Sequence, residues 1–251
     1  MKHALLTIIF LLCCKTCIGA TTIGQGACTQ YPAPDVLTYG LVGYWKFDEG
    51  TGTTALDSSG MGNHGTITGA TWIDGIRGKC LSFDGVDDYV VGYFSQFTNN
   101  TQPITMSMWV NIPESFSWIN GNFIYLGATY YGIGIYRNIA TDTVSYVSRI
   151  GNANPYSLQN KVVSRDVWYH MCLVGNGSTF NAYLNGVKLN SGLLYYGIYD
   201  GSSVNGYIRL ATTAIYGSSG GGFFKGLIDE VRIYNRALDS AEIQTLYYLK
   251  Q

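Results

Sequence analysis

Charged residues are scarce in this sequence. They make up 12% of its 251 positions, with 15 lysines and arginines against 16 aspartates and glutamates. No basic cluster is present that could neutralise a run of phosphates, so nucleic acid is not expected as a partner. Beyond residue 20, no apolar run reaches the length of a membrane-spanning helix. These absences favour a globular protein with neither a nucleic-acid site nor a membrane span.

Residues 1–20 are typical of a secretory signal peptide. Lys2 precedes an apolar run from Ala4 to Cys14, which is too short to cross a bilayer, and Ile18-Gly19-Ala20 supplies the small residues that favour cleavage. A retained membrane anchor is the alternative. We expect cleavage after Gly19 or Ala20, and therefore a secreted, extracellular protein with no membrane span after cleavage.

Cleavage would leave three cysteines, Cys28, Cys80 and Cys172, an odd number in an oxidising compartment. Cys80 and Cys172 both fall in short apolar runs with the pattern of β-strands, which favours a disulfide between neighbouring strands. Cys28 lies in a proline-containing N-terminal tail and could be the partner instead. We therefore predict one disulfide, with Cys80 and Cys172 as the preferred pair, and one free thiol.

From residue 41 onward, short runs of alternating apolar and polar residues are separated by clusters of Gly, Asn, Asp and Ser. This spacing predicts one all-β domain, a sandwich or jelly roll over residues 41–251, with residues 21–40 as an N-terminal tail. The clearest hairpin surrounds Asn185-Gly186, because this pair supplies the two positive φ angles of a type I′ turn. A single helix is expected after Asp239, where Glu242 completes a capping box.

The segment that begins at Gly226 predicts a β-strand with one unusual residue. Alternation places Leu227, Val231 and Ile233 on one face, and Asp229 falls on that same apolar face. An unpaired buried carboxylate costs several kcal/mol. A bound cation, an arginine or a set of backbone N–H groups must therefore compensate Asp229.

Several sequence blocks occur in a fixed order along the chain. They are Gly43–Gly50, Asp57–Gly60, Gly62–Gly65, Lys79–Tyr89, Met106–Val110, Trp168–His170, Leu184–Gly186 and the strand at 226–234 with Leu238–Ile243. Together these blocks resemble the laminin-G-like jelly-roll family and cover residues 41–248. The resemblance implies a concanavalin A-like sandwich of two antiparallel sheets, with the short helix at the C-terminus. Such domains are often secreted and often bind sugars or proteins.

The resemblance also implies a structural calcium ion between the first and last strands. The matching carboxylates are Asp48, Asp57 and Asp229, with backbone carbonyls completing a shell of about six to eight oxygens. The alternative is that Asp229 is satisfied by Arg232, Arg236 or backbone amides. Calcium is thus a possible cofactor of structural type.

Laminarinase-type glucanases share this sandwich, and they place three acids on one strand face in the spacing E-x-D-x-x-E. The four glutamates of this chain do not stand in that spacing; they are Glu49, Glu114, Glu230 and Glu242. Adjacent acidic pairs point to opposite faces of a strand and cannot share a substrate. We therefore expect no catalytic activity, and a polysaccharide-active enzyme is the weakest of the functions considered.

Aromatic residues in polar, turn-rich segments indicate a binding surface. Trp118 lies in such a segment, and Tyr130, Tyr131 and Tyr156 stand near Gly and Asn. The apolar face of a sugar stacks on such rings, while neighbouring polar side chains bind its hydroxyl groups. We expect a glycan ligand at a cell surface or in extracellular matrix. The alternative partner is an extracellular protein, in an adhesion or structural surface role.

Overall fold

The computed structural model describes residues 37–94, 102–113, 122–127, 131–138, 143–150, 156–193, 206–212 and 222–249. The chain divides into two compact units, Met1–Ala33 and Pro34–Gln251, and all described residues belong to the second unit. The predicted signal peptide and Cys28 lie outside the described residues. Among the helices of the described part, none has both the length and the apolar character that a membrane crossing requires.

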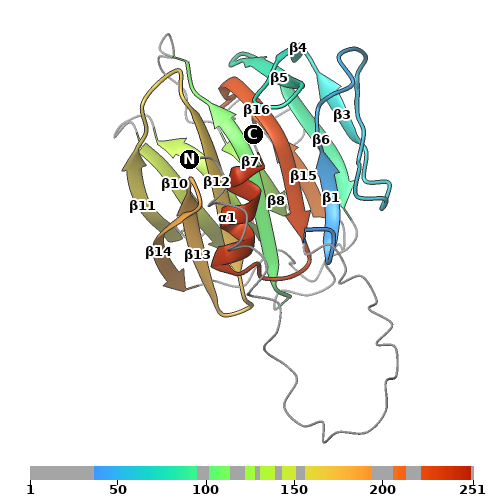
Figure 1. The fold of residues 1–251 in the computed structure, drawn as a ribbon. Helices are drawn as coiled ribbons and strands as arrows, with labels where there is room; N and C mark the ends of the chain where they lie inside the picture. Colours follow the sequence, from blue (N-terminus) through green and yellow to red (C-terminus); the bar gives the residue numbers. More distant parts are fainter. Residues whose placement is uncertain are drawn as a thin grey trace, which may run out of the picture. The chain divides into compact units, whose positions relative to one another are not determined.

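Within the described residues, sixteen strands form two antiparallel sheets (Figure 1). The first sheet has the order β14 (Val187–Leu193), β13 (Thr179–Leu184), β12 (Trp168–Gly175), β7 (Ile104–Asn111), β16 (Lys225–Tyr234), β5 (Lys79–Asp84), β4 (Thr71–Asp74), and β1 (Leu41–Trp45) also pairs with β16. The second sheet has the order β11 (Tyr156–Val162), β10 (Thr143–Ile150), β9 (Tyr131–Asn138), β8 (Asn122–Gly127), β15 (Gly206–Leu210), β6 (Tyr89–Phe94), β3 (Gly65–Thr68), β2 (Thr54–Ala55).

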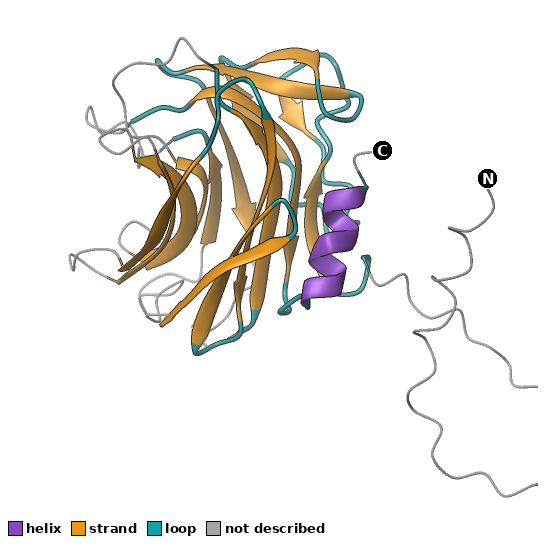
Figure 2. Cartoon of the chain, turned by 60° about the vertical axis from the view of Figure 1, so that its left-hand side comes forward, coloured by secondary structure: helices purple, strands orange, loops and turns teal. Residues whose placement is uncertain are grey.

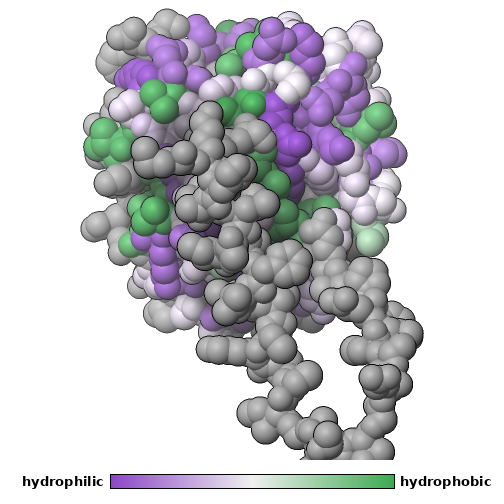
Figure 3. All heavy atoms as spheres, viewed as in Figure 1, coloured by the Kyte–Doolittle hydropathy of each residue, from purple (hydrophilic) through white to green (hydrophobic). Residues whose placement is uncertain are grey.

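The two sheets pack face to face, and helix α1 (Ser240–Tyr248) lies against the outer face of the first sheet (Figure 2). Ile243 and Leu246 of α1 pack with Cys172 and Tyr183 from that face. The all-β sandwich with a short C-terminal helix that the sequence predicts is confirmed. Hydrophilic residues predominate over β4 and β5 on the face seen in Figure 3.

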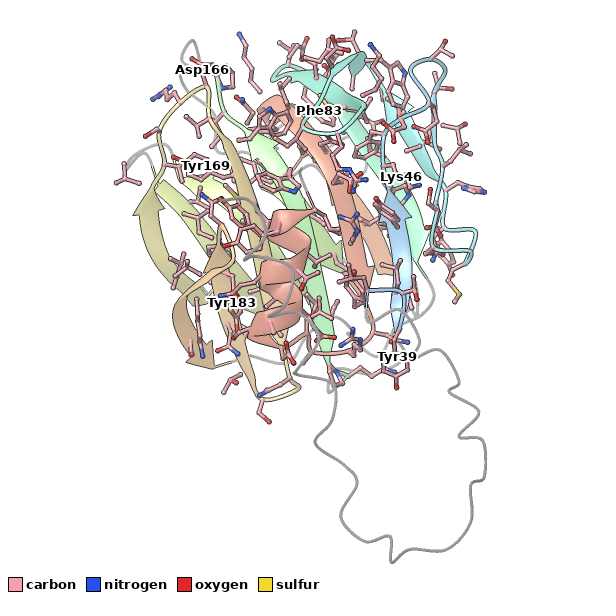
Figure 4. All side chains as sticks on the ribbon, in the orientation of Figure 1. Tyr39, Lys46, Phe83, Asp166, Tyr169 and Tyr183 are labelled. Atoms are coloured by element: carbon pink, nitrogen blue, oxygen red, sulfur yellow. The ribbon has the colours of Figure 1, made fainter. Side chains whose placement is uncertain are left out.

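The core lies between the sheets and is filled by the apolar residues that alternate along the strands. Three phenylalanines connect the layers: Phe83 from β5 (labelled in Figure 4), Phe123 from β8, and Phe224 just before β16. The ring of Phe224 meets Phe123 edge-on at a centroid distance of 4.8 Å and lies 6.4 Å from Phe83. These ring contacts therefore connect strands of both sheets within the core.

Two local predictions are confirmed. Asn185 and Gly186 have φ angles of 51° and 76°, and they connect β13 to β14 as the type I′ turn requires. The side chain of Asp239 accepts hydrogen bonds from the backbone N–H groups of Ala241 and Glu242, and the Glu242 side chain accepts from the Asp239 N–H. This capping box fixes the start of α1.

The alternation predicted for β16 is wrong at its middle. Glu230 has a φ of 53°, and the pairing with β7 shifts register between Asp229 and Arg232. The extra residue of this β-bulge reverses the alternation. Ile228 therefore joins Val231 and Ile233 in the core, and Asp229 points to the opposite face of the sheet rather than to the Val231 face.

The predicted disulfide is also wrong. Cys80 and Cys172 are both buried free thiols. Cys80 lies on β5 and Cys172 on β12, and two strands, β16 and β7, separate them in the sheet. Three strand spacings correspond to about 14 Å, which is roughly twice the Cα separation that a disulfide can span. The error arose because sequence order does not reveal strand order.

Candidate ligand-binding face and the acidic residues near it

The outer face of the second sheet gathers tyrosines around one arginine. Ile208 and Leu210 of β15 point into the core, so Tyr207 and Arg209 point outward. Tyr207 pairs with Tyr93 of β6, and Arg209 pairs with Tyr125 of β8. Directly opposite residues of antiparallel strands share a face. We name these four residues, Tyr93, Tyr125, Tyr207 and Arg209, the tyrosine face.

Three residues of the tyrosine face, Tyr93, Tyr207 and Arg209, are connected by contacts with the Tyr207 ring. Tyr93 and Tyr207 meet edge to face, with centroids 5.9 Å apart and planes at 79°. The Arg209 guanidinium lies 5.1 Å from the Tyr207 ring centroid, and its Nη1 donates to the carbonyl of Gly127 at 3.2 Å. Tyr93 is 48% exposed, whereas Arg209 is only 4% exposed. The face thus combines accessible aromatic surface with a positive charge held largely out of water.

A glycine fixes the position of the Tyr125 ring. Gly134 of β9 pairs with Tyr125, and a Cβ atom on Gly134 would lie 2.7 Å from the carbonyl oxygen of Ile124 and 3.1 Å from Cδ2 of Tyr125. Both contacts are closer than real Cβ atoms normally allow. The absence of a side chain at Gly134 therefore lets the Tyr125 ring lie against the sheet, where one ring face can be presented outward.

The strands of the second sheet contain no aspartate or glutamate within their described bounds. A glycosidase needs a pair of carboxylates that flank the scissile bond. These strands therefore cannot supply such a pair, and what the tyrosine face offers chemically is aromatic stacking and hydrogen bonding.

The predicted ligand residues fall elsewhere or outside the described chain. Trp118 and Tyr130 lie outside the described residues. Tyr131 begins β9, where it pairs with Ile150, and Tyr156 begins β11, where it pairs with Ser148. The tyrosine face itself was missed from the sequence. A signal existed in the alternation Tyr207-Ile208-Arg209-Leu210, which places an aromatic and a cation on the face opposite the aliphatic residues.

Asp229 is fully buried, and backbone N–H groups hold one of its oxygens. Oδ2 accepts from the N–H of Ile76 at 2.9 Å and of Arg77 at 3.2 Å, so the backbone alternative is what the structure shows for this atom. Oδ1 is buried without a hydrogen-bond partner. Burial raises the pKa of Asp229 to about 7, against the hydrogen bonds from Arg77 and Ile76.

The structure does not gather the three predicted calcium ligands into one group. Oδ1 of Asp48 accepts from the Lys79 N–H at 2.9 Å. Both oxygens of Asp57 accept hydrogen bonds; their donors are Tyr44, Ser59 and Asn63. Burial alone would raise the pKa of Asp57, but these hydrogen bonds lower it. Asp57 therefore serves as an acceptor that closes a turn. The calcium ion expected from the sequence stays a prediction at Asp229, whose Oδ1 has no hydrogen-bond partner.

A different acidic group has the spacing of metal ligands. Among the described residues, Asp84, Asp87 and Asp88 are the group whose carboxylate oxygens lie within 4.8 Å of one another. Asp84 and Asp87 are exposed and Asp88 is buried. The Asp84 N–H donates to Oδ2 of Asp88 at 2.8 Å. This triad could hold a metal ion, because hard cations prefer carboxylate oxygens.

The sequence matches a family model over most of the described domain. Residues 84–244 match the family Laminin_G_3, described as the concanavalin A-like lectin/glucanases superfamily. This match spans more than half of the chain.

Solved structures with low sequence identity share the fold. One is domain 4 of AbnA, a GH43 extracellular arabinanase from Geobacillus stearothermophilus, in complex with arabinotriose: 24% identity, TM-score 0.67, covering 82% of this chain and 98% of that chain. Another is the binding domain of Botulinum neurotoxin DC in complex with rat synaptotagmin II: 12% identity, TM-score 0.63, covering 85% and 52%. A third is Trypanosoma rangeli sialidase: 17% identity, TM-score 0.64, covering 83% and 32%.

Proposed function

Because the chain belongs to the concanavalin A-like lectin/glucanases superfamily, we propose that it is a non-catalytic module that binds carbohydrate through the tyrosine face. The observation that carries this proposal is the outward row of Tyr93, Tyr207 and Tyr125 around Arg209 in the middle of a sheet without carboxylates. Pyranose and furanose rings stack on tyrosine, and polar groups at the rim orient their hydroxyls.

Two further observations support carbohydrate as the ligand. A domain with the same fold, from an arabinanase, binds arabinotriose. The N-terminal pattern of residues 1–20 favours secretion, and we propose a cell surface or extracellular matrix as the location of the module. Trp118, Tyr130, Tyr131 and Tyr156 remain the ligand residues predicted from the sequence.

A protein partner is the second candidate function. It is favoured by the botulinum neurotoxin binding domain of the same fold, which was solved with synaptotagmin II. Tyrosine is also enriched at protein interfaces, so the same face would serve. A protein-binding adhesion role, or a structural role at the surface, would follow from this partner.

The test compares matched tyrosine variants on a panel of oligosaccharides that includes arabinotriose. Tyr207→Ala should reduce the affinity for the bound sugar at least tenfold, while Tyr39→Ala should leave it unchanged. Tyr39 is 64% exposed and lies before β1, at the edge of the first sheet, so it controls for loss of a surface tyrosine (Figure 4). Binding that survives Tyr207→Ala would exclude this face. A panel with no binding at all would favour the protein partner.

A further inference from the structure

Two exposed threonines continue the outer face of the second sheet beyond the tyrosine face. Ala55 of β2 and Ile67 of β3 are buried in the core, so Thr54 and Thr66 point outward. Thr54 pairs directly with Thr66, and both are exposed. Opposite threonines can hydrogen-bond to each other, yet within the described part of the chain neither hydroxyl has a hydrogen-bond partner. Both hydroxyl groups are therefore open to a ligand.

Thr66 lies beside the exposed ring of the tyrosine face. On β6, Val90 belongs to the core, so Val91 and Tyr93 point outward. Thr66 pairs with Val91, which makes Tyr93 its diagonal neighbour at a distance of about 7–8 Å. Tyr93 is 48% exposed, and its ring meets that of Tyr207. A sugar that stacks on these rings therefore has hydroxyl groups close to the Thr66 hydroxyl.

The surface from Tyr207 to Thr54 crosses four adjacent strands, β15, β6, β3 and β2. Three strand spacings separate the first of these strands from the last, or about 14 Å, which exceeds the width of a single sugar ring. Strands β2, β3 and β6 carry no charged residue within their described bounds. Beyond the tyrosines, this surface therefore offers hydroxyl groups and no charge.

From this continuity we propose that Thr54 and Thr66 form a hydroxyl-binding subsite next to the tyrosine face, and that the ligand is a neutral oligosaccharide that extends from the tyrosines toward β2. The proposal rests on the proposed function and names the class of sugar. A threonine hydroxyl both donates and accepts hydrogen bonds, as a sugar hydroxyl does. A single sugar on the tyrosines would leave the Thr54 hydroxyl unused, whereas a longer chain can bind it.

The test measures how affinity depends on the length of a neutral saccharide. Two series are compared by calorimetry on the full chain: arabinose with arabinobiose and arabinotriose, and glucose with cellobiose and cellotriose. In at least one series we expect the trisaccharide to bind about tenfold more tightly than the single sugar, because each added hydrogen bond contributes about two- to tenfold in affinity. This gain should be equal at low and high salt, since no charge contributes to it.

Variants without the threonine hydroxyls locate the gain. Thr66→Val should lower the affinity for the trisaccharide about two- to tenfold, and the double variant with Thr54→Val should bring it close to that of the single sugar. Valine is β-branched like threonine and both positions are exposed, so these variants should fold. Thr71→Val is the matched control, because Thr71 is an exposed threonine on β4 of the first sheet.

The outcomes separate the threonine subsite from the proposed function. If a single sugar binds as tightly as its trisaccharide, the subsite is excluded while carbohydrate binding stands. A gain that survives the double variant, that Thr71→Val removes, or that falls at high salt would also contradict the proposal. If no saccharide of either series binds, the proposed function itself fails, and the subsite fails with it.

Discussion

The outer faces of the two sheets differ in whether the chain's own helix covers them. On the first sheet, α1 covers the face, and Trp109 of β7 stacks on Tyr247 of α1 with centroids 5.6 Å apart and planes at 21°. On the second sheet, Tyr93 is half exposed beside a buried Arg209. The first face is sealed by the chain's own helix, whereas the second presents aromatic surface. From this difference we interpret the first face as structural and propose the second face as the one that binds a ligand.

Several buried polar groups of the first sheet pair with each other. Arg232 forms an ion pair with Glu230, and the Tyr44 hydroxyl donates to the same carboxylate. Ser107 and His170 form a buried hydrogen bond of 2.7 Å between Oγ and Nε2. Burial, with the charge of Arg232, lowers the pKa of His170 to about 3, so this histidine is neutral at physiological pH. These groups make contacts that stabilise the fold. Because the Ser107–His170 pair is buried, a substrate cannot reach it.

The largest expected effect comes from removing a side chain that packs between the first sheet and α1. Trp109 is 2% exposed, and replacing a buried tryptophan with alanine costs about 3–5 kcal/mol. Trp109→Ala should therefore lower the free energy of unfolding by that amount, measured by urea denaturation. Tyr248→Ala is the control, since Tyr248 is 61% exposed on the same helix and its loss should cost less than about 0.5 kcal/mol. Equal effects of the two variants would mean that α1 does not seal the first sheet.

Asp229 should make the stability depend on pH. Its pKa of about 7 in the folded protein lies above the ordinary value of 3.8, so between these values the folded state holds a proton that the unfolded state has released. The stabilisation is complete below pH 4 and is lost as the pH rises through 7, with a slope of at most about 1.4 kcal/mol per pH unit. Asp229→Asn, which keeps an oxygen for the N–H groups of Ile76 and Arg77, should remove this component.

Unfolding curves of both proteins across this pH range, with and without calcium, provide the measurement. Parallel pH profiles for wild type and Asp229→Asn would contradict the raised pKa. Calcium tests the ion predicted from the sequence: a cation at Oδ1 would favour the ionised carboxylate and flatten the wild-type slope. An unchanged slope would exclude calcium at this residue.

On the second sheet, Gly134→Val should act through the Tyr125 ring. The new side chain would collide with the carbonyl of Ile124 and with Cδ2 of Tyr125, which should destabilise the protein by about 1–3 kcal/mol and displace the ring. The affinity for the bound sugar should fall with it. The double variant with Tyr125→Ala distinguishes the two effects, because it should bind no more weakly than Tyr125→Ala alone if the glycine acts through the ring. Additive losses would show that Gly134 acts independently of Tyr125.

Whether a feature could be predicted from the sequence depends on how far apart in the chain its interacting residues lie. The type I′ turn at Asn185 and the capping box at Asp239 depend on residues within a few positions, and both were predicted. The bulge at Glu230 was missed, since one inserted residue leaves the apolar pattern on either side intact. The tyrosine face was missed because Tyr93, Tyr125 and Tyr207 meet only through the pairing of β6, β8 and β15, which lie far apart in the chain. Strand order, which no local pattern specifies, therefore determines the site.

The variant with the smallest expected effect on stability gives the most specific test of the difference between the two faces. Tyr93 is 48% exposed and contacts the Tyr207 ring edge-on, so Tyr93→Ala removes one aromatic contact worth about 0.5–1.5 kcal/mol and little buried area. Its free energy of unfolding should therefore fall by about 1 kcal/mol, several times less than for Trp109→Ala, while the affinity for the ligand falls at least as much as the stability does. A face selected for binding tolerates the loss of its rings in folding but not in recognition. If Tyr93→Ala instead destabilised the protein as much as Trp109→Ala and left the affinity unchanged, the second sheet would be as structural as the first, and the distinction between the faces would fail.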